Sequence, residues 1–63
     1  MNKKEEYMYW VKKYWYSMFK YDGYIGEGVY VSDILKDYVD QYDEMTESEV
    51  DQSIKEYKQI LSK

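Results

Sequence analysis

Acidic side chains crowd one stretch of the chain, and these are the residues that could do chemistry. Residues 33–51 hold eight acids and a single lysine, Lys36. The candidate partner-binding acids in this stretch are Asp33, Asp37, Asp40, Asp43, Glu44, Glu47 and Asp51. Four of them, from Asp33 to Glu44, follow i, i+4, i+7, i+11 spacing, which on a helix gives one row with neighbours about 5–6 Å apart. Like charges in such a row repel by a few tenths of a kcal/mol per pair, roughly, so a retained row can have a use.

Two interpretations of this acidic row stay open. The first is a solvated helix face. The second is a surface that resembles nucleic-acid phosphate, because duplex DNA presents one charge per about 3.4 Å of axis on each strand. Such a surface would occupy the basic groove of a nucleic-acid-binding protein.

Metal binding and catalysis have little support in the sequence. The segment DYVDQYDEMTESE lacks the D-x-D-x-D spacing and the turn glycine of a calcium loop. The chain has no His, Cys or Arg, and Gly26-Glu27-Gly28 is only a G-x-G, which is neither a phosphate loop nor a dinucleotide fingerprint. We therefore expect a non-enzymatic protein with no cofactor and no metal site.

A second chemical pattern combines tyrosines with lysines near the N-terminus. Tyr9 and Tyr16 lie beside Lys12, Lys13 and Lys20 on one predicted helix face, and aromatics interleaved with cations can bind single-stranded nucleic acid. The chain is acidic overall, so we favour tyrosines that cover lysine stems or are buried in a dimer. The candidate aromatic contacts with a partner or a second copy are Tyr9, Trp10, Tyr16 and Phe19.

The element that carries these aromatics is a predicted helix over residues 3–20. Nine of the thirteen aromatic residues fall between Tyr7 and Tyr24. Apolar side chains cover roughly half of this helix, more than the usual stripe of about 100°. We expect its inner face to consist of Tyr7, Val11, Tyr14, Trp15 and Met18, with Tyr21 continuing the repeat. Asp22-Gly23 is a typical helix stop.

Two further helices are predicted over residues 32–43 and 46–62. Ser32 is a good N-cap for the first, and Thr46 with Glu49 forms a capping-box signature for the second. Their inner stripes are Val31, Ile34, Leu35, Tyr38, Val39 and Tyr42, then Val50, Ile54, Tyr57 and Leu61, with Ile60 beside them. The link is short, so we expect the two helices to pack as neighbours. This C-terminal half resembles a helix-turn-helix unit, without its turn glycine and with acids at the start of the would-be recognition helix.

The glycine-containing segment 22–31 separates the first helix from the second. Its β-prone residues flank Gly26-Glu27-Gly28, so a minimal β-hairpin or a structured loop fits, and we favour the loop. The fold class predicted is therefore all-α: one small domain, residues 1–63, of three helices. Without cysteine no disulfide can support it, and its core depends on large side chains or on association.

Charge is divided unevenly along the chain. Residues 1–20 carry five lysines and two acids, a net of +3, whereas residues 21–63 carry eleven acids and four lysines, a net of −7. Lysine as the only cation and tyrosine as the main aromatic are typical of an AT-rich bacterial or phage coding sequence. No secretory or membrane-spanning apolar run is visible, so we expect a protein of the bacterial cytoplasm.

In size and charge the chain resembles the small acidic inhibitors encoded by phages and mobile elements, including anti-CRISPR proteins and other DNA mimics. The resemblance rests on the acid-rich run from Asp33 to Asp51, the lack of catalytic residue types and the AT-rich composition. It implies a protein partner with a basic surface, a nuclease or another nucleic-acid-binding protein, and no direct binding to nucleic acid. The alternative is a minimal helix-turn-helix regulator or a dimeric accessory module.

Overall fold

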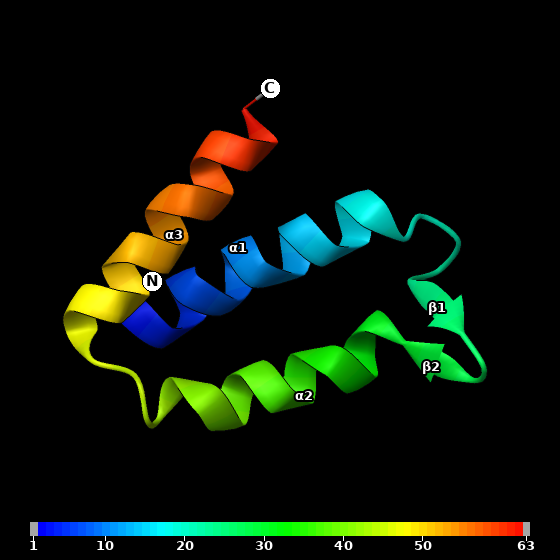
Figure 1. The fold of residues 1–63 in the computed structure, drawn as a ribbon, viewed down its shortest axis with the longest axis horizontal. Coiled ribbons are helices and arrows are strands. Elements are labelled where there is room, and N and C mark those ends of the chain that lie inside the picture. Colours follow the sequence, from blue (N-terminus) through cyan, green and yellow to red (C-terminus); the bar gives the residue numbers. More distant parts are fainter. Residues whose placement is uncertain (1, 63) are drawn as a thin grey trace.

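Three helices and one small hairpin make up the computed structural model, which describes residues 2–62 (Figure 1). The elements in chain order are α1 (Lys3–Met18), β1 (Tyr24–Gly26), β2 (Val29–Tyr30), α2 (Val31–Tyr42) and α3 (Glu47–Leu61). The predicted fold class, a small mostly helical domain with three helices, is confirmed. The molecule is flat, with extents of 34 × 28 × 18 Å.

Helix α1 is the centre of the packing, and both other helices lie against it (Figure 1). Helices α2 and α3 make few contacts with each other, so the expectation that they pack as neighbours is wrong. The reason lies in α1. Its apolar arc is wide enough to receive two helices side by side, and the connection at 43–46 carries the chain around its N-terminal end.

The buried core joins α1 to α3. Tyr7 and Val11 of α1 pack with Val50 and Ile54 of α3, and Tyr7 is only 2% exposed. The half-buried side chains around this core are Met8, Trp10, Trp15, Leu35, Tyr38, Tyr42, Met45 and Tyr57. The inner faces predicted for the three helices are therefore correct near their centres.

The predicted inner faces are wrong toward the free ends of the helices. Met18 and Tyr21 are exposed, because α1 stops at Met18 and Phe19 leaves helical geometry at φ −120° and ψ 83°. The chain then turns away before Tyr21 can reach the core. Val39 and Ile60 are exposed as well, since neither α2 nor α3 has a third helix on its outer side.

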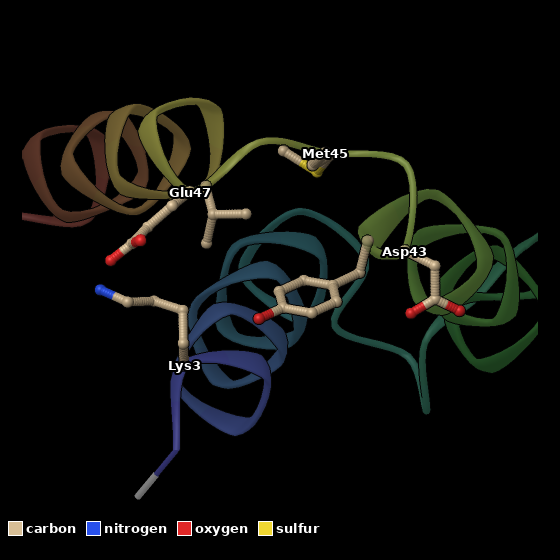
Figure 2. Close-up of a pocket in the computed structure, with 6 residues that line it drawn as sticks. Lys3, Asp43, Met45 and Glu47 are labelled. Atoms are coloured by element: carbon tan, nitrogen blue, oxygen red, sulfur yellow. The ribbon is translucent and has the colours of Figure 1, made fainter.

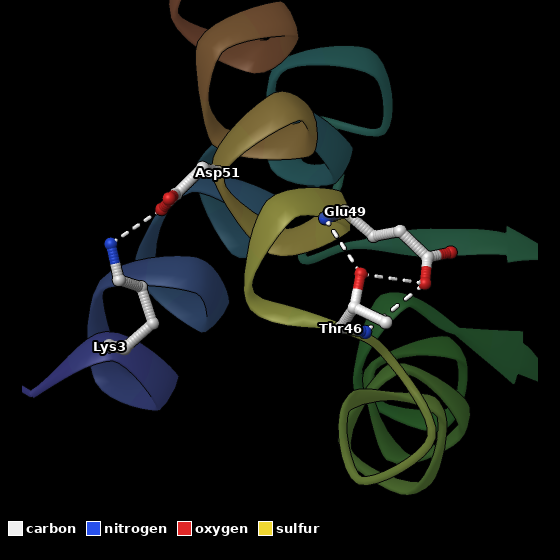
Figure 3. Close-up of polar contacts among 4 residues, drawn as sticks. All are labelled: Lys3, Thr46, Glu49 and Asp51. Carbon is white, nitrogen blue, oxygen red and sulfur yellow. Dashed lines mark hydrogen bonds and ion pairs between the residues drawn. The ribbon is translucent and has the colours of Figure 1, made fainter.

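Local hydrogen bonds fix where α3 begins. The Thr46 hydroxyl accepts from the Glu49 backbone N–H at 3.2 Å, and the Glu49 carboxylate accepts from the Thr46 backbone N–H at 3.1 Å (Figure 3). The backbone bond from Thr46 lowers the pKa of Glu49 below its usual value. The predicted capping box is thus confirmed.

Helix α2 begins one residue earlier than the predicted range, and its N-cap lies two residues before the predicted one. The N-cap is Tyr30, and the Asp33 carboxylate accepts from the Tyr30 backbone N–H at 2.9 Å. Ser32 therefore lies inside the first turn and is not the cap. The helix starts early because Tyr30, the last residue of β2, has the extended backbone conformation that an N-cap requires.

Residues 24–30 form an antiparallel hairpin, so the loop that the sequence favoured is wrong and the β-hairpin alternative is correct. Tyr24 pairs with Tyr30 and Gly26 with Val29. The Tyr24 hydroxyl accepts from the Gly28 backbone N–H at 3.2 Å, and the Tyr24 and Tyr30 rings lie 5.2 Å apart. These contacts across the turn stabilise the hairpin, because strands of two and three residues are not stable by themselves.

Candidate protein-binding surface

The seven candidate acids are all exposed, but they do not form one row. Asp33, Asp37 and Asp40 follow one side of α2. Helix α2 ends at Tyr42, so Glu44 lies in the turn beyond it and the predicted four-residue helical row contains three residues. This α2 row is defined here as Asp33, Asp37 and Asp40.

The remaining acids border the junction where the three helices meet. Asp51 forms an ion pair with Lys3, with 2.6 Å between the Lys3 Nζ and the carboxylate oxygen (Figure 3). The hydrogen bond to Asp51 raises the pKa of Lys3. Both side chains are exposed, so the pair contributes little to stability. It does neutralise Asp51 in part, and it joins the start of α1 to the second turn of α3.

A hollow of about 490 Å³ opens at the same junction. Its charged lining consists of Lys3, Asp43 and Glu47, and its apolar lining of Tyr42, Met45 and Val50. Figure 2 shows Lys3 and Glu47 on one side, with Asp43 on the opposite side. Carboxylates beside an apolar floor suit a basic side chain, which buries its aliphatic stem while its charged head stays among the acids.

The candidate aromatic contacts on α1 and at its C-cap, Phe19, are mostly engaged within the chain. Trp10 lies edge-on to Tyr9 at 5.2 Å, and lysines 13 and 58 approach the Trp10 ring at 5.5 and 5.4 Å. Phe19 stacks on Trp15 at 5.9 Å. Tyr16 is half-buried, and Tyr9 alone of the four is exposed. Lys13 Nζ lies 5.5 Å from the centroid of the Tyr9 ring, and the part of these aromatic residues in a partner or dimer contact stays a prediction.

The exposed apolar side chains that sequence reasoning missed lie at the hairpin end of the molecule. Tyr21, Tyr24, Val29 and Tyr30 are all exposed, with Tyr21 at 89%. They are defined here as the hairpin patch. The sequence signal for this exposure was the pair of β-prone segments on either side of a G-x-G. Such segments predict a short antiparallel pair of strands, and a pair of this kind cannot bury both of its faces.

Buried tyrosines between the helices predict a loss of stability at alkaline pH. Burial raises the pKa of the Tyr7 and Tyr57 hydroxyls, and the adjacent Tyr38 hydroxyl raises that of Tyr57 further. A folded-state pKa above the unfolded value of about 10 means that folding favours the protonated form. Stability from these groups is therefore full below about pH 10 and is lost as the pH rises through their folded-state pKa values.

Tyrosinate absorbance and circular dichroism, recorded together against pH, check this expectation. A fraction of the tyrosines should ionise only as helix is lost, and Tyr57→Phe should shrink that fraction. Complete ionisation with full helix content would contradict the expectation.

The structure offers no obvious centre for a bound ion. Within residues 2–62, no group of three acidic side chains is arranged to hold a metal. Across the same residues, no helix combines the length and apolar character needed to cross a membrane.

Comparison of the chain with protein-family models, curated proteins and solved structures gives no match.

Proposed function

We propose that this chain is a non-enzymatic inhibitor that uses its acidic side to occupy the basic nucleic-acid-binding site of another protein. The observation that carries the proposal is the α2 row with the acids that follow it. Asp33, Asp37, Asp40, Asp43 and Glu44 are exposed along one helix and its adjoining turn. Their spacing is similar in scale to that of phosphates along a nucleic-acid strand.

The availability of these charges supports the proposal. Within the part of the chain that the structure describes, the one ion pair is Lys3–Asp51, which leaves the α2 row free of lysine partners. Carboxylates in high dielectric steer a basic partner toward the surface and select against acidic ones. The proposed location is the bacterial cytoplasm. The proposed partner is a nuclease or another DNA- or RNA-binding protein.

The experiment begins with capture of the partner from a bacterial lysate and its purification. The chain should then displace labelled nucleic acid from that partner, and it should not retard duplex DNA by itself. Asp37→Lys with Asp40→Lys should weaken displacement by about tenfold or more, because each reversed charge meets a basic surface. The variant should keep the fold, because Asp37 and Asp40 are exposed and lysine has a higher helix propensity than aspartate and suits the C-terminal half of α2.

A matched control reverses two exposed acids elsewhere, Glu5→Lys with Glu56→Lys. It changes the net charge by the same amount, so a loss limited to the α2 variant assigns the effect to the α2 row. Equal displacement by both variants would contradict the proposal. Retardation of duplex DNA by the wild type, weakening steeply with salt, would indicate a regulator that binds DNA directly.

A further inference from the structure

The hairpin of β1 and β2 lies at one end of the molecule, beside the first turn of α2 (Figure 1), and the apolar side chains of the hairpin patch are exposed. Single exposed apolar residues are normal on a protein surface, but neighbouring ones mark interaction sites. Tyrosine is also among the residues that dominate binding hot spots. The feature to explain is therefore four exposed apolar side chains within residues 21–30.

The hairpin holds this patch in a fixed shape. Its base is closed by the Val31 backbone N–H, which donates to the Gly23 carbonyl at 2.7 Å. Gly23 is buried, and a Cβ atom there would lie 2.6 Å from the Tyr16 ring, so the hairpin sits tightly on α1. The bond from Gly28 to the Tyr24 hydroxyl closes its tip. A surface held in this way binds without a large ordering cost.

Within residues 21–35 every charged side chain is acidic, and Lys20 and Lys36 lie directly outside this range. The acids of this range are Asp22, Glu27 and Asp33. Asp33, whose carboxylate accepts from the backbone N–H of the N-cap Tyr30, is also the first member of the α2 row. One hydrogen bond thus connects Tyr30 of the hairpin patch to Asp33 of the α2 row.

We infer that the hairpin patch is the apolar anchor of the acidic surface, and that it docks into an apolar depression with a basic rim on a protein partner. The α2 row then lies along the basic surface beside that depression. Contact between two copies through the patch would bring Asp22, Glu27 and Asp33 of each chain together, and their repulsion disfavours it. This inference rests on the proposed function and names the contact that supplies its apolar binding energy.

The test uses two synthetic peptides of equal positive charge as probes. One is oligolysine, and the other alternates lysine with leucine so that it offers apolar side chains with a basic rim. Backbone amide NMR shifts of the labelled full chain report where each peptide binds. We expect the lysine–leucine peptide to perturb the hairpin patch and the α2 row, and oligolysine to perturb the α2 row alone.

Matched tyrosine variants assign the apolar contact. Tyr30→Ser combined with Tyr21→Ser should weaken binding of the lysine–leucine peptide by about tenfold and leave oligolysine binding unchanged. Tyr9→Ser is the control, because Tyr9 is 47% exposed and Tyr30 is 43% exposed, and Tyr9 lies on the outer face of α1. Circular dichroism verifies that each variant retains its helices, and the amide NMR shifts of residues 24–30 verify that the hairpin is retained without the contact between the Tyr24 and Tyr30 rings.

Three results would overturn the inference. Equal binding of the lysine–leucine peptide to the hairpin variant and the wild type would show that the hairpin patch is not the apolar anchor. A larger loss with Tyr9→Ser places the apolar contact on α1. Patch shifts that grow with the chain's own concentration indicate self-association. Failure of the proposed function gives a different result. Displacement of nucleic acid from the partner would then not depend on the charges of the α2 row, independently of how the two peptides bind.

Discussion

Gly23→Ala is expected to destabilise the protein by about 3 kcal/mol, through two effects at one position. The residue has φ +74°, in the left-handed region that costs other residues about 1–2 kcal/mol. A Cβ atom would also lie 2.6 Å from the Tyr16 ring and 3.2 Å from the Val31 side chain. Tyr16 would have to move, and the base of the hairpin would separate from α1. Chemical denaturation followed by circular dichroism measures the loss.

Gly28 provides a control for the backbone effect. Its φ is +79°, almost the same as that of Gly23, but a Cβ atom there meets open space. Gly28→Ala should therefore cost only the conformational part, about 1–2 kcal/mol. Repeating Gly23→Ala in a Tyr16→Ala background should bring its cost down toward the Gly28 value, because the shortest contact is gone and only the 3.2 Å contact with Val31 remains. Equal costs for the two glycines in the wild-type background would show that Tyr16 does not hold the hairpin.

The features that the sequence predicted well are the local ones. Thr46 and Glu49 are three residues apart, and the hydrogen bonds between them depend on little else in the chain. The apolar repeat of α1 placed Tyr7 and Val11 correctly in the core, because a helix of sixteen residues fixes which side chains share a face. The exposure of the acids on α2 follows from the same periodicity.

The features that the sequence did not predict depend on contacts between distant residues. The hairpin is supported by the packing of Tyr16 against Gly23, and the Lys3–Asp51 pair joins residues 48 positions apart. A short link between α2 and α3 also suggested that they pack together, yet each gains more by covering α1. Helices α2 and α3 are separated because the apolar face of α1 is wide enough for both of them. Packing against α1 therefore outweighs the tendency of a short connection to bring two helices together.

The candidate surface shows the same division between local and distant effects. Sequence spacing located the α2 row, but it could not show that Glu44 falls beyond the helix or that Asp51 is paired with Lys3. It also assigned the aromatic contact in part to Trp10 and Phe19, which have partners inside the chain. Their role in partner binding stays a prediction, while the hairpin patch holds the more exposed aromatics.

Tyr7→Ala is expected to remove most of the stability of this small domain. Tyr7 is 2% exposed, belongs to the buried core and lies 5.8 Å from the Tyr42 ring. Loss of a buried aromatic side chain costs about 3–5 kcal/mol. A chain of this length has a total free energy of unfolding of about 3–9 kcal/mol. Denaturation midpoints by circular dichroism should therefore fall sharply, with a measurable unfolded population before any denaturant is added.

Two companion variants separate the causes of that loss. Tyr9→Ala removes the same atoms two residues away from an exposed position, so its cost should stay within about 0.5 kcal/mol. Tyr7→Phe keeps the ring and removes only the hydroxyl whose pKa burial raises, so it should retain most of the stability and reduce the alkaline sensitivity. If Tyr7→Ala cost no more than Tyr9→Ala, the contact between α1 and α3 could not be the core. The hairpin and the acidic row would then have no fixed scaffold to hold them side by side.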